Sequence, residues 1–185
     1  MKISLSSSDI ARALPKVRRG VVQYTAIQNT YDSPKNLRAA TDFQRRFNAF
    51  YRVRRNAKWR SAFFLLLLKS RTRPLSLRQV LTQIYRQTGR IEASFASKLV
   101  ATANPDLPVI DSVVLKNLGL KLPSNTSSDR IRQVCKLHSQ LHSTYKSFLR
   151  SRMGRNLVAQ FRREYPSAHL SEVKMLDLVL WQSRP

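Results

Sequence analysis

Apolar residues recur along most of the chain at intervals of three and four, the spacing of one buried face of an α-helix. This spacing, with the Ser, Asn, Pro and Gly residues that start or stop helices, predicts most of the secondary structure. The expected helices cover about residues 9–18, 35–54, 57–70, 77–88, 111–118, 129–152 and 155–164, with a further helical pattern after Glu92 and a last helix beginning at Ser171.

Two segments depart from this one-faced pattern. Gly20 is expected to end the first helix, and residues 21–27 form the one strand-like run, interpreted as extended coil because no partner strand follows. The 57–70 segment is apolar nearly all round because Leu65 and Leu68 add to its buried face, so we expect it to lie centrally. The prediction is an all-α fold of about eight helices.

The chain length suits a single all-helical domain. With 185 residues and 42% hydrophobic residues, it can bury a sizeable core. We expect one compact domain over 1–185, with a two-lobed arrangement as the alternative. Its parts are an N-terminal extension and first helix (1–34), basic helices plus a central motif (35–122), and C-terminal helices (123–185).

Cysteine content and hydropathy favour an intracellular location. Cys135 is the single cysteine, which excludes an intrachain disulfide and fits a reducing compartment. The longest apolar run, residues 62–68, is far shorter than the roughly 20 residues of a membrane helix. The N-terminus lacks the continuous apolar core of a signal peptide. The expectation is a cytoplasmic, soluble protein that is nucleoid-associated if bacterial, with no membrane partner.

The charge points to an anionic partner. The 34 Lys and Arg residues outnumber 10 Asp and Glu, giving a formal net charge of +24, and the first 90 residues carry +17 of it. A field of this size favours nucleic acid, with DNA ahead of RNA, while anionic lipid or an acidic protein are the alternatives. Seven basic residues within a stretch of 16 are the predicted phosphate contacts: Arg45, Arg46, Arg52, Arg54, Arg55, Lys58 and Arg60.

Aromatic residues alternate with these basic residues. Aromatic rings can stack on unpaired bases. However, Phe47, Phe50, Tyr51 and Trp59 recur at the spacing of a buried stripe, so we expect these rings to belong to the core. The arginines lack acidic residues that would balance them, since none occurs between positions 42 and 92. A solvated face normally mixes both signs, so the arginines favour binding of a polyanion.

The stretch from 89 to 122 carries the candidate chemistry. A small, polar segment containing Glu92 and Lys98 leads into a helix pattern, followed by the proline-bounded loop 104–108. Asp111 then opens a short apolar helix that stops at Gly119. An aspartate before an apolar run, with a glycine at its end, is also the ordinary pattern of a helix N-cap and C-terminal stop. Both interpretations of Asp111 stay open at this point.

Residues 108–114, Pro-Val-Ile-Asp-Ser-Val-Val, followed by Leu118-Gly119-Leu120, resemble the signature of the helix-hairpin-helix DNA glycosylase superfamily. The resemblance covers about residues 89–122. In that superfamily a Pro-Val-Asp-Thr-His-Val type segment precedes Leu-Gly-Leu, and its aspartate is catalytic. The segment before Lys98 would correspond to the hairpin that holds a DNA phosphate, although it lacks the superfamily's Gly-x-Gly turn.

The resemblance implies an all-α enzyme that flips a modified base out of DNA and cuts its glycosidic bond. It would make Asp111 the carboxylate that stabilises the charge developing on the sugar, and Lys98 an amine nucleophile that forms a Schiff base. Glu92 would serve as acid or base, or would cap its helix, the interpretation we favour. Ser94 and Ser97 would contact DNA from the hairpin. The alternative is a nucleic-acid-binding module without chemistry, or a basic partner of an acidic assembly.

Metal and cofactor sites are not expected. Cys135, His138 and His142 share one helix face and are ligand types that zinc uses. Three ligands from one helix are geometrically awkward, so we interpret this face as packed against the core. With four glycines in the whole chain, no phosphate-cradling loop can be identified and no cofactor is predicted.

Overall fold

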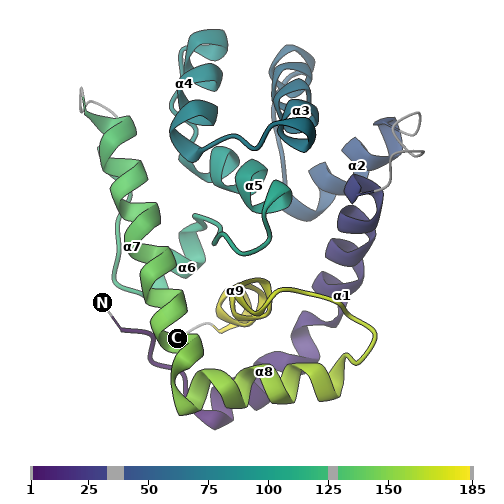
Figure 1. Cartoon of the computed structure of the whole chain (residues 1–185), viewed down its shortest axis with the longest axis vertical. Coiled ribbons are helices and arrows are strands. Elements are labelled where there is room, and N and C mark those ends of the chain that lie inside the picture. Colours follow the sequence, from purple (N-terminus) through teal and green to yellow (C-terminus); the bar gives the residue numbers. More distant parts are fainter. Residues whose placement is uncertain (1, 33–39, 125–128, 184–185) are drawn as a thin grey trace.

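The computed structural model describes residues 2–32, 40–124 and 129–183, and over these ranges it contains nine α-helices and no strand (Figure 1). The all-α prediction is confirmed. In chain order the helices are α1 (Ser7–Asp32), α2 (Ala40–Tyr51), α3 (Ala57–Thr72), α4 (Leu77–Thr88), α5 (Ala93–Ala103), α6 (Ser112–Asn117), α7 (Arg130–Arg150), α8 (Arg152–Glu164) and α9 (Glu172–Gln182). None of these described helices is long and apolar enough to cross a membrane.

Helix α1 is longer than predicted, because it continues through Gly20 and the strand-like run. The prediction of extended coil over 21–27 was wrong. Val21, Tyr24 and Ile27 are all buried, at the three-residue spacing of a helix face. Gly20 lies against Leu178 of α9, where an added Cβ would come within 3.3 Å of that side chain. Packing against α2 and α9 therefore outweighs the local preference of the β-branched residues.

Helices α3 and α4 begin where their capping residues predicted. The Asn56 side chain accepts the Trp59 amide at 2.9 Å, and Ser76 forms a capping box with Gln79. Gly89 ends α4 in the left-handed conformation, with φ of 67°. The predicted central position of α3 was wrong, since Leu65 is 59% exposed and Leu68 is 37% exposed. Helix α3 lies at the periphery of the molecule (Figure 1).

The corner between α7 and α8 lies at Ser151, three residues before the predicted break at Gly154. Ser151 accepts the Gly154 amide at 3.1 Å and so caps α8. Gly154 itself lies in the first turn of α8, where an added Cβ would be 2.1 Å from the Phe148 carbonyl oxygen. The predicted helix starts at Ser128 and at residues 33–34 lie outside the described residues.

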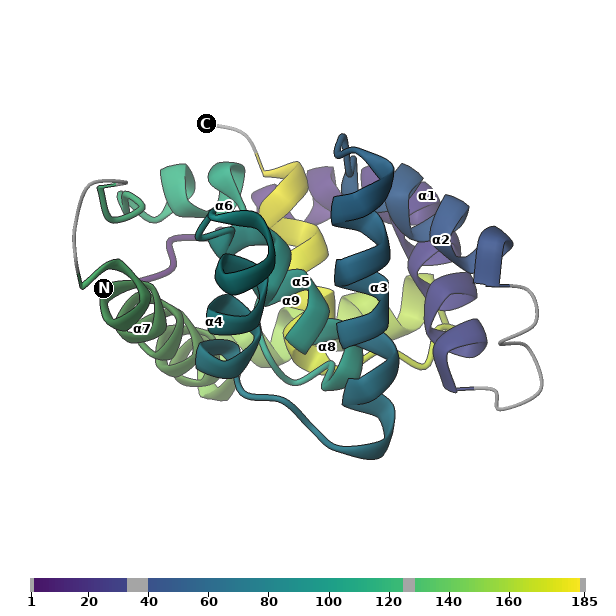
Figure 2. The same cartoon turned by 90° about the horizontal axis from the view of Figure 1, so that it is seen from above.

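Two buried clusters make up the core. One joins α2, α3, α4 and α5 with the end of α1 and the start of α7. The other joins α1, α7, α8 and α9 with the N-terminal segment and α6. Helix α9 runs through the middle of the second group, surrounded by α1, α7 and α8 (Figures 1 and 2). Phe50, at the end of α2, packs against both clusters and marks the junction at which the candidate site lies.

Candidate functional site

A cavity of about 470 Å³ lies at the junction of the two clusters. Most of its lining comes from the end of α2 and the turn after it, the start of α5, the loop leading into α6 with the first turn of that helix, and α9, and Leu122 completes it. All three predicted catalytic residues, Glu92, Lys98 and Asp111, are among its lining residues. The structure therefore brings together side chains that are up to 19 positions apart in the sequence.

Ser97 fixes the loop before Asp111 to helix α5. Its hydroxyl accepts the Ile110 amide at 2.9 Å and donates to the Ser94 carbonyl at 2.8 Å. Ser97 is fully buried, so the prediction that it contacts nucleic acid does not fit this position. Its hydrogen bonds instead place Asp111 opposite α5. Ser94, one turn earlier, does line the cavity.

Lys98 is buried, with its ammonium group near the turn after α2. Its Nζ donates to the Tyr51 carbonyl at 3.4 Å and lies 5.0 Å from the centre of the Phe95 ring. Burial lowers the pKa of Lys98, and this effect outweighs the opposing influence of the Asp111 and Asp177 carboxylates. No ion pair within 4 Å involves Lys98 in the described part of the chain. Lys98 is thus closer to the neutral, nucleophilic amine than an exposed lysine would be.

Asp111 both caps a helix and lines the cavity. Its Oδ1 accepts the Val113 amide at 2.8 Å, which confirms the N-cap interpretation, and Gly119 follows the helix with φ of 65°. Within the described ranges, Oδ2 takes part in no hydrogen bond or ion pair. One carboxylate oxygen therefore stabilises α6 while the other remains available to a bound group.

Glu92 does not cap α5 with its side chain, so the predicted cap was wrong. Its carboxylate is instead held by Arg55, whose Nη2 lies 3.0 Å from Oε1 and 3.1 Å from Oε2. The Arg55 guanidinium also lies 5.1 Å from the Phe95 ring centre. Both carboxylate oxygens are occupied by the guanidinium, and the Glu92–Arg55 pair forms part of the cavity wall.

Two of the seven predicted phosphate contacts, Arg52 and Arg55, line the cavity. Arg52 is exposed and has a positive φ of 53°, which is uncommon for a residue with a side chain. Its guanidinium lies 5.8 Å from the ring centre of Trp181, which also lines the cavity. A basic residue over an aromatic ring at a cavity wall offers both a charge and a stacking surface to a ligand.

The other predicted contacts are dispersed. Lys58 lies with Arg55 and Arg90 in a groove of about 660 Å³ between α3 and α4. Arg45 and Arg46 both pair with Asp42 on the exposed side of α2, at 2.6 Å each. Arg54 is exposed and Arg60 is half-buried. Of the interleaved aromatic residues, three are buried and one is partly buried, as their spacing predicts: Phe47, Tyr51, Trp59 and Phe50.

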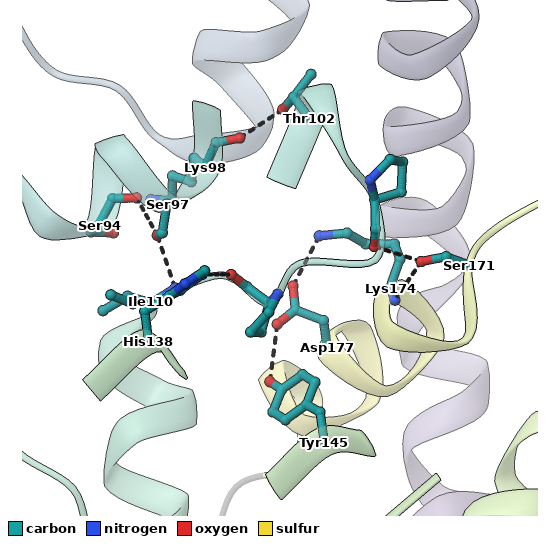
Figure 3. Close-up of polar contacts among 12 residues, drawn as sticks. Ser94, Ser97, Lys98, Thr102, Ile110, His138, Tyr145, Ser171, Lys174 and Asp177 are labelled. Atoms are coloured by element: carbon teal, nitrogen blue, oxygen red, sulfur yellow. Dashed lines mark hydrogen bonds and ion pairs between the residues drawn. The ribbon is translucent and has the colours of Figure 1, made fainter. Parts of the chain in front are cut away.

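The sequence analysis missed the contribution of α9 to the cavity. Lys174 and Asp177 line it and form a buried ion pair at 2.9 Å, and Tyr145 donates to the second Asp177 oxygen at 3.1 Å (Figure 3). Burial is the largest single influence and acts to lower the pKa of Lys174, but the Asp177 carboxylate together with Tyr51 and Tyr24 raises that pKa above its usual value. Lys174 and Asp177 stand three positions apart on an otherwise largely apolar helix, and this pattern could have indicated from the sequence that α9 carries a buried ion pair.

The helix face with the cysteine and histidines is partly packed, since Cys135 and His142 are half-buried. His138 is buried, and its Nε2 lies 2.9 Å from the Pro108 carbonyl oxygen, the geometry of an N–H donating to that carbonyl. Over the residues that the structure describes, no group of three His, Cys, Asp or Glu side chains could hold a metal ion.

Comparison with protein-family models, curated proteins and solved structures finds no match for this chain. The resemblance of residues 89–122 to the helix-hairpin-helix DNA glycosylases therefore stays a prediction. The cavity and the charged residues that line it are therefore the basis of the function proposed below.

Proposed function

We propose that this protein is a cytoplasmic DNA-binding protein that holds one extruded nucleotide in the cavity and cuts the glycosidic bond of a modified base. The observation that carries the proposal is the meeting of Lys98 and Asp111 in one cavity that Arg52 and Arg55 also line. The cavity combines a desolvated amine, a carboxylate oxygen without a partner among the described residues, and arginines suited to phosphate.

The cavity suits a base and its sugar in size and lining. Its volume of about 470 Å³ lies within the range of roughly 300–1,000 Å³ that small-ligand sites occupy. Phe50, Phe95 and Trp181 supply apolar and aromatic surface against which a base can stack. The net charge of +24 supplies the long-range attraction to phosphate, which offsets the few kcal/mol that base extrusion costs.

Asp111 fits the role of the carboxylate beside the sugar. Departure of the base leaves positive charge on the sugar, and a carboxylate at that position stabilises this charge or activates water. Oδ1 is held by the Val113 amide, which fixes the side-chain rotamer, and Oδ2 is left for the reaction. A carboxylate that is already oriented stabilises the transition state without reorganising.

Lys98 fits the role of an amine nucleophile. Its lone pair would form a bond to the anomeric carbon as the bond to the base breaks, and the base would leave with the bonding electrons and a proton. One Nζ proton would pass to the departing base; the bond between the anomeric carbon and the ring oxygen would then break, the ring oxygen would take the second Nζ proton, and a Schiff base would remain. The lowered pKa of Lys98 increases the fraction of unprotonated amine at neutral pH.

The test is base release from a panel of duplexes, each with one modified base, at low salt. Asp111→Asn removes the charge but keeps the helix cap, because Asn is as good an N-cap as Asp. The matched control is Asp106→Asn, at an exposed position in the preceding loop. We expect release by the wild type and by the control, and at least a hundredfold loss in Asp111→Asn with DNA affinity unchanged. Release that survives Asp111→Asn would refute the assigned role.

The second candidate is a nucleic-acid-binding module without chemistry, which the charge alone favours. Tight, salt-dependent binding with no release from any duplex would support it. Binding no tighter than that of a polylysine of equal charge would instead indicate a basic partner of an acidic assembly.

A further inference from the structure

The ion pair of Lys174 and Asp177 has no role in the mechanism proposed above, although both residues line the cavity. Lys174 is 1% exposed and Asp177 is 9% exposed, so both charges are almost fully removed from bulk water. Figure 3 shows the Lys174 side chain meeting Asp177 on the α9 side of the loop that carries Ile110, with Tyr145 reaching the pair from α7.

A buried ion pair of this kind is weak evidence for stability. Desolvation of the two charges offsets most of their attraction, and apolar residues of similar volume often replace such pairs without loss. The neighbouring α9 residues Met175, Leu176 and Leu178 show that this helix otherwise buries apolar side chains. The position of the pair at a cavity wall suggests that its charges serve a bound group.

The pair places a cation with hydrogen-bond donors to spare among the residues that line the cavity. Both oxygens of Asp177 are occupied, one by Lys174 at 2.9 Å and the other by the Tyr145 hydroxyl at 3.1 Å. Lys174 has three N–H donors, of which Asp177 takes one, while the Tyr24 ring centre lies 4.6 Å from Nζ. The Tyr51 hydroxyl is buried close to Thr102 and Lys174, belongs to a cavity-lining residue and can donate or accept.

We propose that the ammonium group of Lys174, held in place by Asp177, donates a hydrogen bond to an oxygen of the base that enters the cavity. The site then selects bases with an oxo group over bases with an amino group at the edge that faces α9. This inference rests on the proposed function and adds the class of base to it.

The selection follows from matching donors with acceptors. An amino group at the same edge would set its donors against the ammonium group and give that buried cation no acceptor, which costs more than losing a hydrogen bond in water. Sites built around a specific hydrogen bond reject ligands that cannot form it. The raised pKa of Lys174 keeps it charged, so the donor is present throughout the neutral range.

The experiment compares binding of matched duplexes by the Asp111→Asn chain, in which the bond to the base is not cut. The test nucleotide faces an abasic site, so its extrusion breaks no base pair. Hypoxanthine against adenine and uracil against cytosine each exchange an oxo group for an amino group. We expect the oxo member of each pair to bind roughly tenfold more tightly. Equal binding of the two members would overturn the inference.

A second comparison assigns the preference to the ion pair. Lys174→Met with Asp177→Asn removes both charges and keeps an acceptor for the Tyr145 hydroxyl. In this background the oxo preference should disappear, whereas Lys116→Met, an exposed lysine on α6, should keep it. A preference that persists without the pair would overturn the inference. The first comparison retains the pair, so it does not depend on the folding of the double variant.

The two proposals fail in different ways. If none of the chains binds any of the duplexes, the proposed function and the inference fall together. If the duplexes bind and the wild type releases a base, but oxo and amino bases bind equally, the inference alone falls.

Discussion

Replacing Ser97 with alanine tests how the candidate site is assembled. In the folded chain the Ser97 hydroxyl joins α5 to the loop before α6 through the Ile110 amide, at 2.9 Å. Both residues are 0% exposed, so water cannot take the place of the hydroxyl in the native structure. The alanine variant would leave the Ile110 amide buried and unpaired.

The expected loss of stability follows from the cost of leaving the Ile110 amide without a partner. A buried donor without a partner costs about 1–3 kcal/mol, and the hydroxyl that is removed also gives up its own bond to the Ser94 carbonyl. We expect Ser97→Ala to lower the free energy of unfolding by about 2 kcal/mol, or Tm by roughly 4–8 °C for a chain of this size. The loop can also pair its amide by shifting, which would displace Asp111 from the cavity and reduce base release.

The assay is urea denaturation followed by circular dichroism, with base release measured on the same samples. Ser94→Ala is the matched control, because it removes a hydroxyl one turn away on the same helix while its carbonyl remains. We expect the control to change stability by less than about 0.5 kcal/mol. If Ser97→Ala is as stable as Ser94→Ala, the hydrogen bond to Ile110 does not hold this loop, and the reasoning fails.

Three further predictions concern the scaffold around the site. Gly154→Ala should destabilise the chain by at least about 2 kcal/mol in the same denaturation assay, because the new Cβ would meet the Phe148 carbonyl oxygen at 2.1 Å; a change below about 0.5 kcal/mol would contradict the close approach. Burial lowers the pKa of His138, so the unfolded chain binds the proton more readily and stability should fall as pH decreases from about 7 to 5. His138→Gln should flatten that part of the Tm-against-pH curve, and an unchanged slope would exclude His138 as its source. Asp177→Asn alone should cost about 3–5 kcal/mol by leaving the Lys174 charge buried without its partner, while adding Lys174→Met should recover most of this loss; independent, additive costs would refute the pairing.

Local signals predicted the helices well wherever a capping residue and an apolar stripe agreed. Asn56 and Ser76 start α3 and α4 as expected, and Gly89 ends α4. The error at residues 21–27 has a different origin, since β-branched residues after Gly20 favour extended structure locally. Their helical conformation comes from burial against α2 and α9, which are distant in the sequence. Such tertiary contacts cannot be read from a short window of sequence.

The candidate site likewise contains residues that the sequence pointed to and residues that only tertiary packing brings to the cavity. Glu92, Lys98 and Asp111 belong to one continuous stretch, and its resemblance to the helix-hairpin-helix glycosylase signature implied that they share a site. Lys174 and Trp181 belong to α9, which the second core cluster brings to the cavity. The sequence pattern of this helix is that of a buried helix, apart from the charged residues Lys174 and Asp177 within it. The position of α9 depends on packing against α1, α7 and α8, and this packing has no local signature.

The two cavity lysines show how that packing determines chemistry. Lys98 and Lys174 are both buried, yet their pKa values shift in opposite directions, downward for Lys98 and upward for Lys174. The difference is a carboxylate at 2.9 Å, which Asp177 provides to Lys174 and no described residue provides to Lys98 at ion-pair distance. The cavity therefore contains Lys174, which stays charged, and Lys98, whose amine can lose its proton. Binding and reaction can then be carried out by different side chains. Under the proposed function Lys98 attacks the sugar, and under the inference that rests on it Lys174 holds the base, so the two lysines have different roles.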